Sequence, residues 1–281
     1  MPASIRLAAA LLLSGLALPA AAEGTLDKLK ASGEIHLGYR ADAAPLSYAG
    51  GDGLPAGYTV DVCEAVAELL GTALGTPLKP SYVLVTAEDR FDAVADGRVD
   101  LLCEPSTVTL TRREQIDFSI PTFVDGAAVL LPKGASPELS ALAGKKVGVV
   151  EGTTTEDALR NTLAATKTDA TIVPVASHEA GIAALEAGTI SAYFGDQAIL
   201  FHLLATSDKS DALSISDNTL TVEKQALGLP LGDGAYRLAV DRALSELYHT
   251  GRMVEIFKAN LPGAKPGPAL SALFLLAPEL P

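Results

Sequence analysis

Short apolar runs alternate with amphipathic helical stretches along almost the whole chain, and this alternation constrains the fold more than any other feature. The helical stretches include Val60–Leu70 and Ala235–His249. The apolar runs are those expected of buried strands, namely Ile35–Tyr39, Ser81–Val85, Val99–Cys103, Ala127–Leu131, Lys146–Val150, Thr171–Val175, Ile190–Phe194 and Ala226–Leu229. Strands interleaved with helices indicate an α/β protein with parallel sheets.

Two similar units lie in the two halves of the chain and suggest two lobes of similar design. Residues 93–104 read AVADGRVDLLCE, and residues 184–196 read ALEAGTISAYFGD. Each unit has the end of a helix, a glycine suited to the position after it, a strand and an acidic residue at the strand's carboxyl end. Ligands of open α/β sheets bind beyond these ends. Two such ends facing each other would therefore form a cleft.

The first 22 residues have the pattern of a secretory signal peptide. Arg6 precedes the apolar run Leu7–Leu18, and small residues follow up to Ala22. This order of charge, apolar run and small residues is typical of a cleavable signal, and the run is shorter than the roughly 20 residues that span a bilayer. We therefore expect cleavage after Ala22 and export, with a buried N-terminal helix as the alternative.

Export bears on the redox state of the two cysteines of the chain, Cys63 and Cys103. An oxidising compartment allows two cysteines to pair, so we expect a disulfide between them. Two buried free thiols are the alternative.

Charge and motif content exclude several classes of protein. The 34 acidic residues exceed the 21 basic ones and give a net charge of −13. Such a chain is a poor partner for nucleic acid, because neutralising phosphates requires clustered lysine and arginine. The sequence has no zinc-ligand spacing, nucleophile elbow, Walker A loop or dinucleotide fingerprint. We expect no metal, no cofactor and no nucleic-acid partner.

The segment Thr107–Ser119, TVTLTRREQIDFS, is the strongest candidate for ligand chemistry. Thr111 and Glu114 have capping-box spacing, which predicts a helix that starts at Arg112. A cation is disfavoured in a first helical turn, so its presence suggests a counter-anion. Helix N–H groups and a guanidinium together form a carboxylate receptor. The alternatives are a solvated arginine or a local pair between Arg112 and Asp117.

A second candidate anion site lies in Lys145–Asp157, KKVGVVEGTTTED. A buried strand enters a glycine turn, and Thr153 and Glu156 again have capping-box spacing. The N–H groups of Thr154 and Thr155 would then face outward from the start of a helix, where anions bind. An ordinary capped helix that binds nothing is the alternative.

Four further residues lie where a strand ends or a helix begins. Arg40 closes the first strand, and Arg90 and His178 follow possible helix caps. Asp196 follows the strand Ile190–Phe194 and is either a ligand contact or the cap of the next helix. Each of these residues, taken alone, is more typical of a surface position.

These stretches resemble the periplasmic polar amino acid-binding proteins, family 3 of the solute-binding proteins of ABC transporters. The resemblance covers nearly the whole mature chain. Its T-x-T-x-x-R-x-x-x-x-D-F-S pattern, at residues 107–119, is the most specific part. The other matching stretches are GEIHLGYRADAAPLSY, GYTVDVCEAVAELLG, DGRVDLLCEPSTVTLTRREQIDFSIP, KKVGVVEGTTTEDAL and ALEAGTISAYFGDQAIL.

The resemblance implies a type II periplasmic binding protein-like fold, with two α/β lobes, two crossover strands and a ligand cleft between the lobes. We expect lobe one at residues 23–124 and 222–281 and lobe two at residues 125–221. In this family Arg112 matches the arginine that grips the α-carboxylate of the ligand, and Thr107 and Thr154 match residues that meet the same carboxylate. Asp196 matches the acid that holds the α-ammonium group.

A narrower match is to the glutamate/aspartate-binding branch. Arg40, Arg90 and His178 fall on positions that surround the side-chain carboxylate of the ligand in that branch, and an arginine pair suits a second carboxylate. Thr153, Glu104 and Pro105 complete the expected ligand-binding set. Two departures stand out, because Ala43 replaces the stacking aromatic residue of many members and Glu104-Pro105 replaces small residues. Glu104 is suited to bind the ammonium group, but it would also repel an acidic side chain.

The function implied is capture of a polar, acidic amino acid by lobe closure and delivery to the permease of an ABC importer. The protein is then a periplasmic monomer and not an enzyme. The first alternative is an enzyme on the same fold, because cyclohexadienyl dehydratases resemble this family, with Glu104 or Glu179 as acid or base. The second is a ligand-sensing protein.

Overall fold

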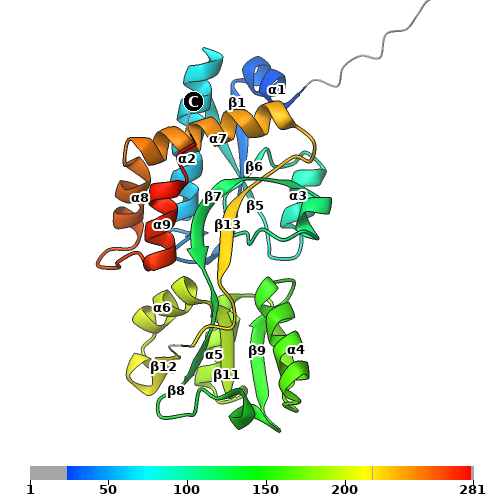
Figure 1. The fold of residues 1–281 in the computed structure, drawn as a ribbon, viewed down its shortest axis with the longest axis vertical. Helices are drawn as coiled ribbons and strands as arrows, with labels where there is room; N and C mark the ends of the chain where they lie inside the picture. The colour runs from blue at the N-terminus through cyan, green and yellow to red at the C-terminus, as the bar shows by residue number, and fades with distance from the viewer. Residues whose placement is uncertain (1–23, 217, 280–281) are drawn as a thin grey trace, which may run out of the picture.

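Two five-stranded sheets form the cores of two lobes, and Figure 1 shows the two lobes one above the other. The computed structural model describes residues 24–216 and 218–279. The expected signal peptide, residues 1–22, lies outside the described residues. In the part of the chain that is described, no helix is both long enough and apolar enough to cross a membrane.

The first sheet has the strand order β5 (Lys79–Leu84), β1 (Glu34–Tyr39), β6 (Leu101–Leu102), β13 (Glu223–Leu229) and β7 (Asp117–Asp125). β1 is parallel to β5 and β6, whereas β13 is antiparallel to β6 and β7. The helices of this lobe are α1 (Thr25–Ser32), α2 (Tyr58–Leu74), α3 (Arg90–Ala95), α7 (Gly234–His249), α8 (Arg252–Asn260) and α9 (Pro268–Leu276). Apolar side chains of α2, α7, α8 and α9 share one buried core with β1 and β13, which fixes the strand ends that reach the cleft.

The second sheet has the order β10 (Thr171–Val175), β9 (Lys146–Val150), β11 (Ala192–Asp196), β8 (Ala127–Pro132) and β12 (Leu213–Ile215). β9 is parallel to both neighbours. Helix α4 (Thr154–Thr166) packs on one face, where Leu159 contacts the core of Val147 and Val149. Helices α5 (His178–Glu186) and α6 (Gln197–Thr206) pack on the other face, where Leu185 and Leu200 are buried. Both faces are covered, so the inner strands β8, β9 and β11 are largely apolar and buried.

Two antiparallel strands connect the lobes. β7 and β13 pair from Asp117 and Leu229 at one end to Asp125 and Glu223 at the other, and Figure 1 shows them running from one lobe toward the other. At the crossing, a Cβ atom on Gly126 would overlap the carbonyl oxygen of Thr221. The two crossings therefore pass each other more closely than any larger residue at Gly126 would allow.

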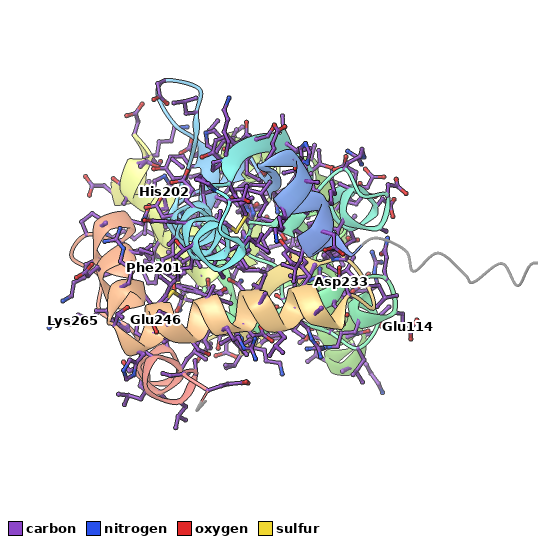
Figure 2. All side chains as sticks on the ribbon, turned by 90° about the horizontal axis from the view of Figure 1, so that it is seen from above. Glu114, Phe201, His202, Asp233, Glu246 and Lys265 are labelled. Carbon is purple, nitrogen blue, oxygen red and sulfur yellow. A yellow bond between two sulfur atoms is a disulfide. The ribbon has the colours of Figure 1, made fainter. Side chains whose placement is uncertain are left out.

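The expected disulfide is present between Cys63 in α2 and Cys103 just after β6, with a Cα–Cα distance of 6.0 Å. Disulfides appear as yellow bonds in Figure 2. Beside the first sheet lies a small sheet of β2 (Asp42–Ala43), β3 (Ser47–Ala49) and β4 (Pro55–Ala56). Single 3-10 turns are η1 (Arg112–Glu114), η2 (Leu139–Leu142) and η3 (Ser210–Ala212).

The α/β prediction is correct, but the sheets are mixed rather than parallel, because β13 is antiparallel to β6 and β7 and β8 is antiparallel to β11 and β12. The α-helix expected at Arg112 is also wrong. Arg112–Glu114 form only the 3-10 turn η1, and the Thr111 side chain makes no cap. The Arg112 N–H instead donates to Thr109 Oγ1 at 3.1 Å. Because β7 begins at Asp117, the chain has room for only one turn at this point. Arg112 therefore does not lie at the N-terminus of an α-helix, whereas Thr154 does, at the start of α4.

Candidate ligand-binding cleft

A narrow cleft lies between the lobes, with a cavity volume of about 20 Å³, room for little more than a water molecule. Nine of the ten predicted ligand-binding residues line it, and the exception is Glu104. From lobe one come Arg40, Arg90, Pro105, Thr107 and Arg112; from lobe two come Thr153, Thr154, His178 and Asp196. The carboxyl ends of β1, β6, β9 and β11 bring these segments together, as expected of an open α/β sheet.

The Arg112 guanidinium is the cation of the cleft that lacks an acidic partner. Its Nη1 donates to the Thr107 carbonyl at 2.8 Å, and its Cζ lies 4.9 Å from the centre of the Phe91 ring. Among the described residues, no carboxylate oxygen lies within 4.0 Å of this guanidinium. Asp117, the local partner considered above, instead faces Arg237 at 3.8 Å. Burial lowers the pKa of Arg112, and the negative charge of Glu104 opposes that effect.

The start of α4 faces Arg112 from the other lobe. The Thr153 side chain caps this helix by accepting from the Glu156 N–H at 3.2 Å, as the sequence predicts. Thr154 and Thr155 are then the first helical residues, whose N–H groups have no partner inside the helix. This end of the cleft combines a guanidinium with a helix N-terminus, and both favour an anion.

Glu223 lies beside the cleft, where it is hydrogen-bonded to two of the lining residues, and the sequence did not reveal it. From the start of β13, its Oε2 accepts from Thr107 Oγ1 at 2.5 Å and from Thr154 Oγ1 at 2.8 Å. These two hydroxyl groups belong to different lobes, so one carboxylate on the crossover strand joins them. No local pattern marks this role of Glu223, because these two partners lie 116 and 69 residues away.

Asp196 is the N-cap residue of α6, but its side chain makes no capping bond. Its Oδ2 accepts from Gln225 Nε2 at 2.8 Å, and its Oδ1 accepts from Thr155 Oγ1 at 3.4 Å. Desolvation in the cleft, followed by the charge of Glu223, raises the pKa of Asp196 to about 6. Burial and the charge of Asp196 raise the pKa of the neighbouring Asp125 to about 8. The cleft thus holds a carboxylate that an ammonium group would stabilise.

Arg40 is buried and forms a two-bond pair with Asp42. Its Nε donates to Oδ1 at 2.9 Å and its Nη2 donates to Oδ2 at 2.8 Å. The same Asp42 Oδ2 accepts from the backbone N–H of His178 at 3.3 Å, at the start of α5. Asp42 therefore connects lobe one to lobe two beside the cleft.

The His178 imidazole is a neutral group of the cleft wall. Its Nδ1 lies 2.8 Å from Tyr193 Oη, which leaves the other ring nitrogen for a ligand. Burial, followed by the positive charge of Arg40, lowers the pKa of His178 to about 3. The Tyr193 ring fits because residue 181 is glycine, where a Cβ atom would overlap the ring.

Arg90 and Glu104 form a buried and incompletely bonded pair. Arg90 Nε lies 3.4 Å from Glu104 Oε1, and the Ser106 hydroxyl donates to that same oxygen. Arg90 Nη2 donates to the Gly152 carbonyl of lobe two at 3.4 Å. Within the described part of the chain, Arg90 Nε and Nη1 and Glu104 Oε2 have no hydrogen-bond partner. Burial lowers the pKa of Arg90 to about 10, so the group stays charged at neutral pH.

The geometry does not favour acid–base catalysis by either carboxylate considered above. Glu104 is 1% exposed and lies outside the cleft lining. Glu179 is exposed and does not line the cleft either. Among the described residues, no group of three His, Cys, Asp or Glu side chains is placed to hold a metal ion. The cleft instead combines anion-binding groups with a carboxylate suited to an ammonium group.

Comparison with known proteins agrees with this geometry. Residues 35–262 match the family described as bacterial extracellular solute-binding proteins, family 3. The L-glutamate/L-aspartate-binding protein of Pseudomonas aeruginosa is 32% identical over 98% of this chain and 93% of its own. The glutamate/aspartate import solute-binding protein of Escherichia coli is 27% identical over 99% and 92%.

A solved structure shares the fold. The solute receptor for L-cysteine of Neisseria gonorrhoeae superposes with a TM-score of 0.76 at 24% identity, over 87% of this chain and 98% of its own.

Proposed function

Because the chain belongs to family 3 of the bacterial extracellular solute-binding proteins, we propose that it captures a polar, acidic amino acid by lobe closure and delivers it to an ABC importer. The observation that carries this proposal is Arg112, a half-buried guanidinium that has no acidic partner among the described residues and faces the start of α4 across the cleft. A ligand α-carboxylate supplies the missing negative charge.

The ligand α-carboxylate binds Arg112 from lobe one and the first N–H groups of α4 from lobe two. The hydroxyl groups of Thr107 and Thr154 already donate to Glu223. The guanidinium and the backbone N–H groups of Thr154 and Thr155 are therefore the donors that remain for the ligand.

The ligand ammonium group binds Asp196, and the side chain extends toward Arg40, Arg90 and His178. All four residues line the same cleft as Arg112. An ammonium ion beside Asp196 favours the ionised carboxylate. The side-chain acid fits the arginine pair, and the named ligands of the Pseudomonas and Escherichia relatives have the same chemistry.

Binding drives closure because the ligand contacts both lobes at once. A ligand that bound the open and the closed forms equally would not shift their populations. Only the closed form allows one carboxylate to bind both Arg112 and α4, and this contact supplies the difference in affinity. We place the hinge at residues 121–128 and 221–227, between lobe one (23–124 and 222–281) and lobe two (125–221).

The partner in transport is the membrane permease of an importer, and the protein works as a periplasmic monomer after signal cleavage. The Escherichia coli relative is named a glutamate/aspartate import solute-binding protein, which supports a role in import.

A thermal-shift screen of residues 23–281 against the twenty amino acids tests the proposal. Ligand that binds only the folded protein raises the melting temperature, by an amount that grows with concentration above the dissociation constant. We expect glutamate and aspartate to raise it strongly and arginine and leucine to leave it unchanged. No shift with any amino acid would refute the proposed function.

A further inference from the structure

Two side chains of the crossover strand β13 bond to lobe two from the lobe-one side of the cleft. Glu223 Oε2 accepts from Thr154 Oγ1 at 2.8 Å, and Gln225 Nε2 donates to Asp196 Oδ2 at 2.8 Å. Residues two positions apart in a strand lie on the same face, and both side chains are buried, whereas Lys224 between them is exposed. Neither side chain lines the cleft, but both bind residues that do.

The other hydrogen bonds that cross the cleft between described residues are longer. Arg90 Nη2 lies 3.4 Å from the Gly152 carbonyl, and the His178 N–H lies 3.3 Å from Asp42 Oδ2. The hydroxyl groups of the two lining threonines, one from each lobe, are also 3.4 Å apart. Such distances lie near the limit for a hydrogen bond. The two bonds from β13 therefore dominate the polar attraction across the cleft.

The Glu223 carboxylate is also coupled to the hinge. Its Oε2 accepts from the Thr107 hydroxyl, and its Oε1 accepts from the Thr221 hydroxyl. The Thr221 oxygen in turn accepts from the N–H of Ala127 on the other crossing at 2.9 Å. Glu223 is thus held in place by lobe one and by both crossings, with one oxygen directed at lobe two.

The lobes lie too close together at this separation for an amino acid to fit between them, because the cavity of about 20 Å³ has room for little more than a water molecule. We propose that Glu223 and Gln225 form a latch, through Thr154 and Asp196, that stabilises a closed arrangement from which the ligand is excluded. The latch must release before the ligand enters. This inference rests on the lobe closure of the proposed function and adds an arrangement that opposes binding.

The latch also engages groups that the ligand needs. Gln225 uses an oxygen of Asp196, the proposed partner of the ammonium group, and Glu223 holds Thr154, the first residue of α4. A form that excludes the ligand lowers the apparent affinity in proportion to its population. Association is slower when it requires a conformational change first. Breaking either bond should therefore enlarge the open population and speed association.

Distances between the lobes test the latch without any ligand. Both natural cysteines are in the disulfide, so spin labels couple to cysteines introduced at exposed positions by Asp96→Cys in lobe one and Asn161→Cys in lobe two. By double electron–electron resonance we expect mainly a short distance in the otherwise wild-type protein. Glu223→Ala and Gln225→Ala should each add a longer distance. Lys224→Ala is the matched control on the exposed face of the same strand, and it should keep the wild-type distribution.

Stopped-flow tyrosine fluorescence with L-glutamate is the second measurement. Gln225→Ala breaks a bond between the lobes without changing the formal charge, so faster association would not reflect weaker repulsion of an anion. We expect its association rate constant to exceed the wild-type value by at least about threefold. Lys224→Ala should stay near the wild-type rate at 0.15 M salt, because an exposed charge is screened. Circular dichroism establishes that each variant is folded.

Two results would overturn the inference. Identical distance distributions in the wild-type protein and in both folded variants would show that the two bonds do not hold the lobes together. Variants that open but bind L-glutamate no faster than the wild type would show that the latched form does not exclude the ligand. Folded protein that gives the expected distances but binds no L-glutamate would instead refute the proposed function, while the distances would still support the latch.

Discussion

At the scale of single residues, Arg112 and its neighbour Arg113 have similar sequence surroundings but different environments. Arg112 lines the cleft, whereas the Arg113 guanidinium lies 5.8 Å from the ring of Phe118, away from the cleft lining. We expect Arg112→Ala to weaken ligand binding by about 2–5 kcal/mol, because one partner of a buried charge pair is lost. Calorimetry measures the effect, with Arg113→Ala as the control that keeps wild-type affinity. Equal affinities for both variants would remove Arg112 from the site.

The raised pKa of Asp196 should make ligand binding depend on pH. Its pKa of about 6 in the empty cleft means that a proton competes with the ligand ammonium group below that pH. Affinity should therefore fall as the pH decreases from 7.5 to 5, approaching a tenfold loss per pH unit at the acid end. Asp125, with its pKa raised to about 8, and His178, with its pKa lowered to about 3, stay uncharged over most of this range.

Calorimetry at pH 7.5, 6 and 5 checks this dependence. Asp196→Asn should bind weakly at every pH and lose most of the slope. The same affinity of the wild-type protein at pH 7.5 and pH 5 would mean that Asp196 does not hold the ammonium group.

At the scale of elements, the cap of α4 positions the lobe-two half of the carboxylate site. Thr153 Oγ1 accepts from the Glu156 N–H. Thr153→Ala removes that acceptor and should lower the free energy of unfolding by about 1 kcal/mol, whereas Thr153→Ser keeps the hydroxyl and should stay near the wild-type value. Urea unfolding measures both variants. A Thr153→Ala protein as stable as the wild type would show that the cap contributes little.

Elements whose signal is local were predictable from the sequence. β9 and β10 begin and end where their apolar runs do, the cap of α4 is the threonine expected from capping-box spacing, and the possible cap before His178, Ser177, does cap α5. β7 was missed, because its nine residues include Pro121 and several polar side chains. It is a strand because β13 pairs with it across about a hundred residues of sequence, and no local pattern carries that information.

The residues of the cleft likewise divide into those with a local sequence signal and those without one. Arg112, Thr154 and Asp196 lie in motifs, so sequence and resemblance together located them. Glu223 and Asp42 act through partners in other segments, and Asp42 contacts His178 from 136 residues away. These contacts join segments that are far apart in sequence, so no local pattern could predict them.

At the scale of the whole molecule, the disulfide restricts the unfolded chain of lobe one. Cys63 and Cys103 are 40 residues apart in sequence. Closing a loop of that length stabilises the folded state by about 4 kcal/mol in the chain-entropy model. Reduction of the disulfide should therefore lower the free energy of unfolding by about 4 kcal/mol. Guanidinium unfolding with and without reductant measures this difference. Superimposable unfolding curves would show that the bond contributes nothing.

Recognition of the α-carboxylate by groups from both lobes is the central claim, because it explains both binding and closure. 4-Aminobutyrate tests it directly, since it keeps the amine and the distal carboxylate of glutamate but lacks the α-carboxylate. In calorimetric titrations of residues 23–281, we predict that L-glutamate binds and that 4-aminobutyrate at the same concentration gives no measurable heat of binding. Equal affinity for the two compounds would contradict the account.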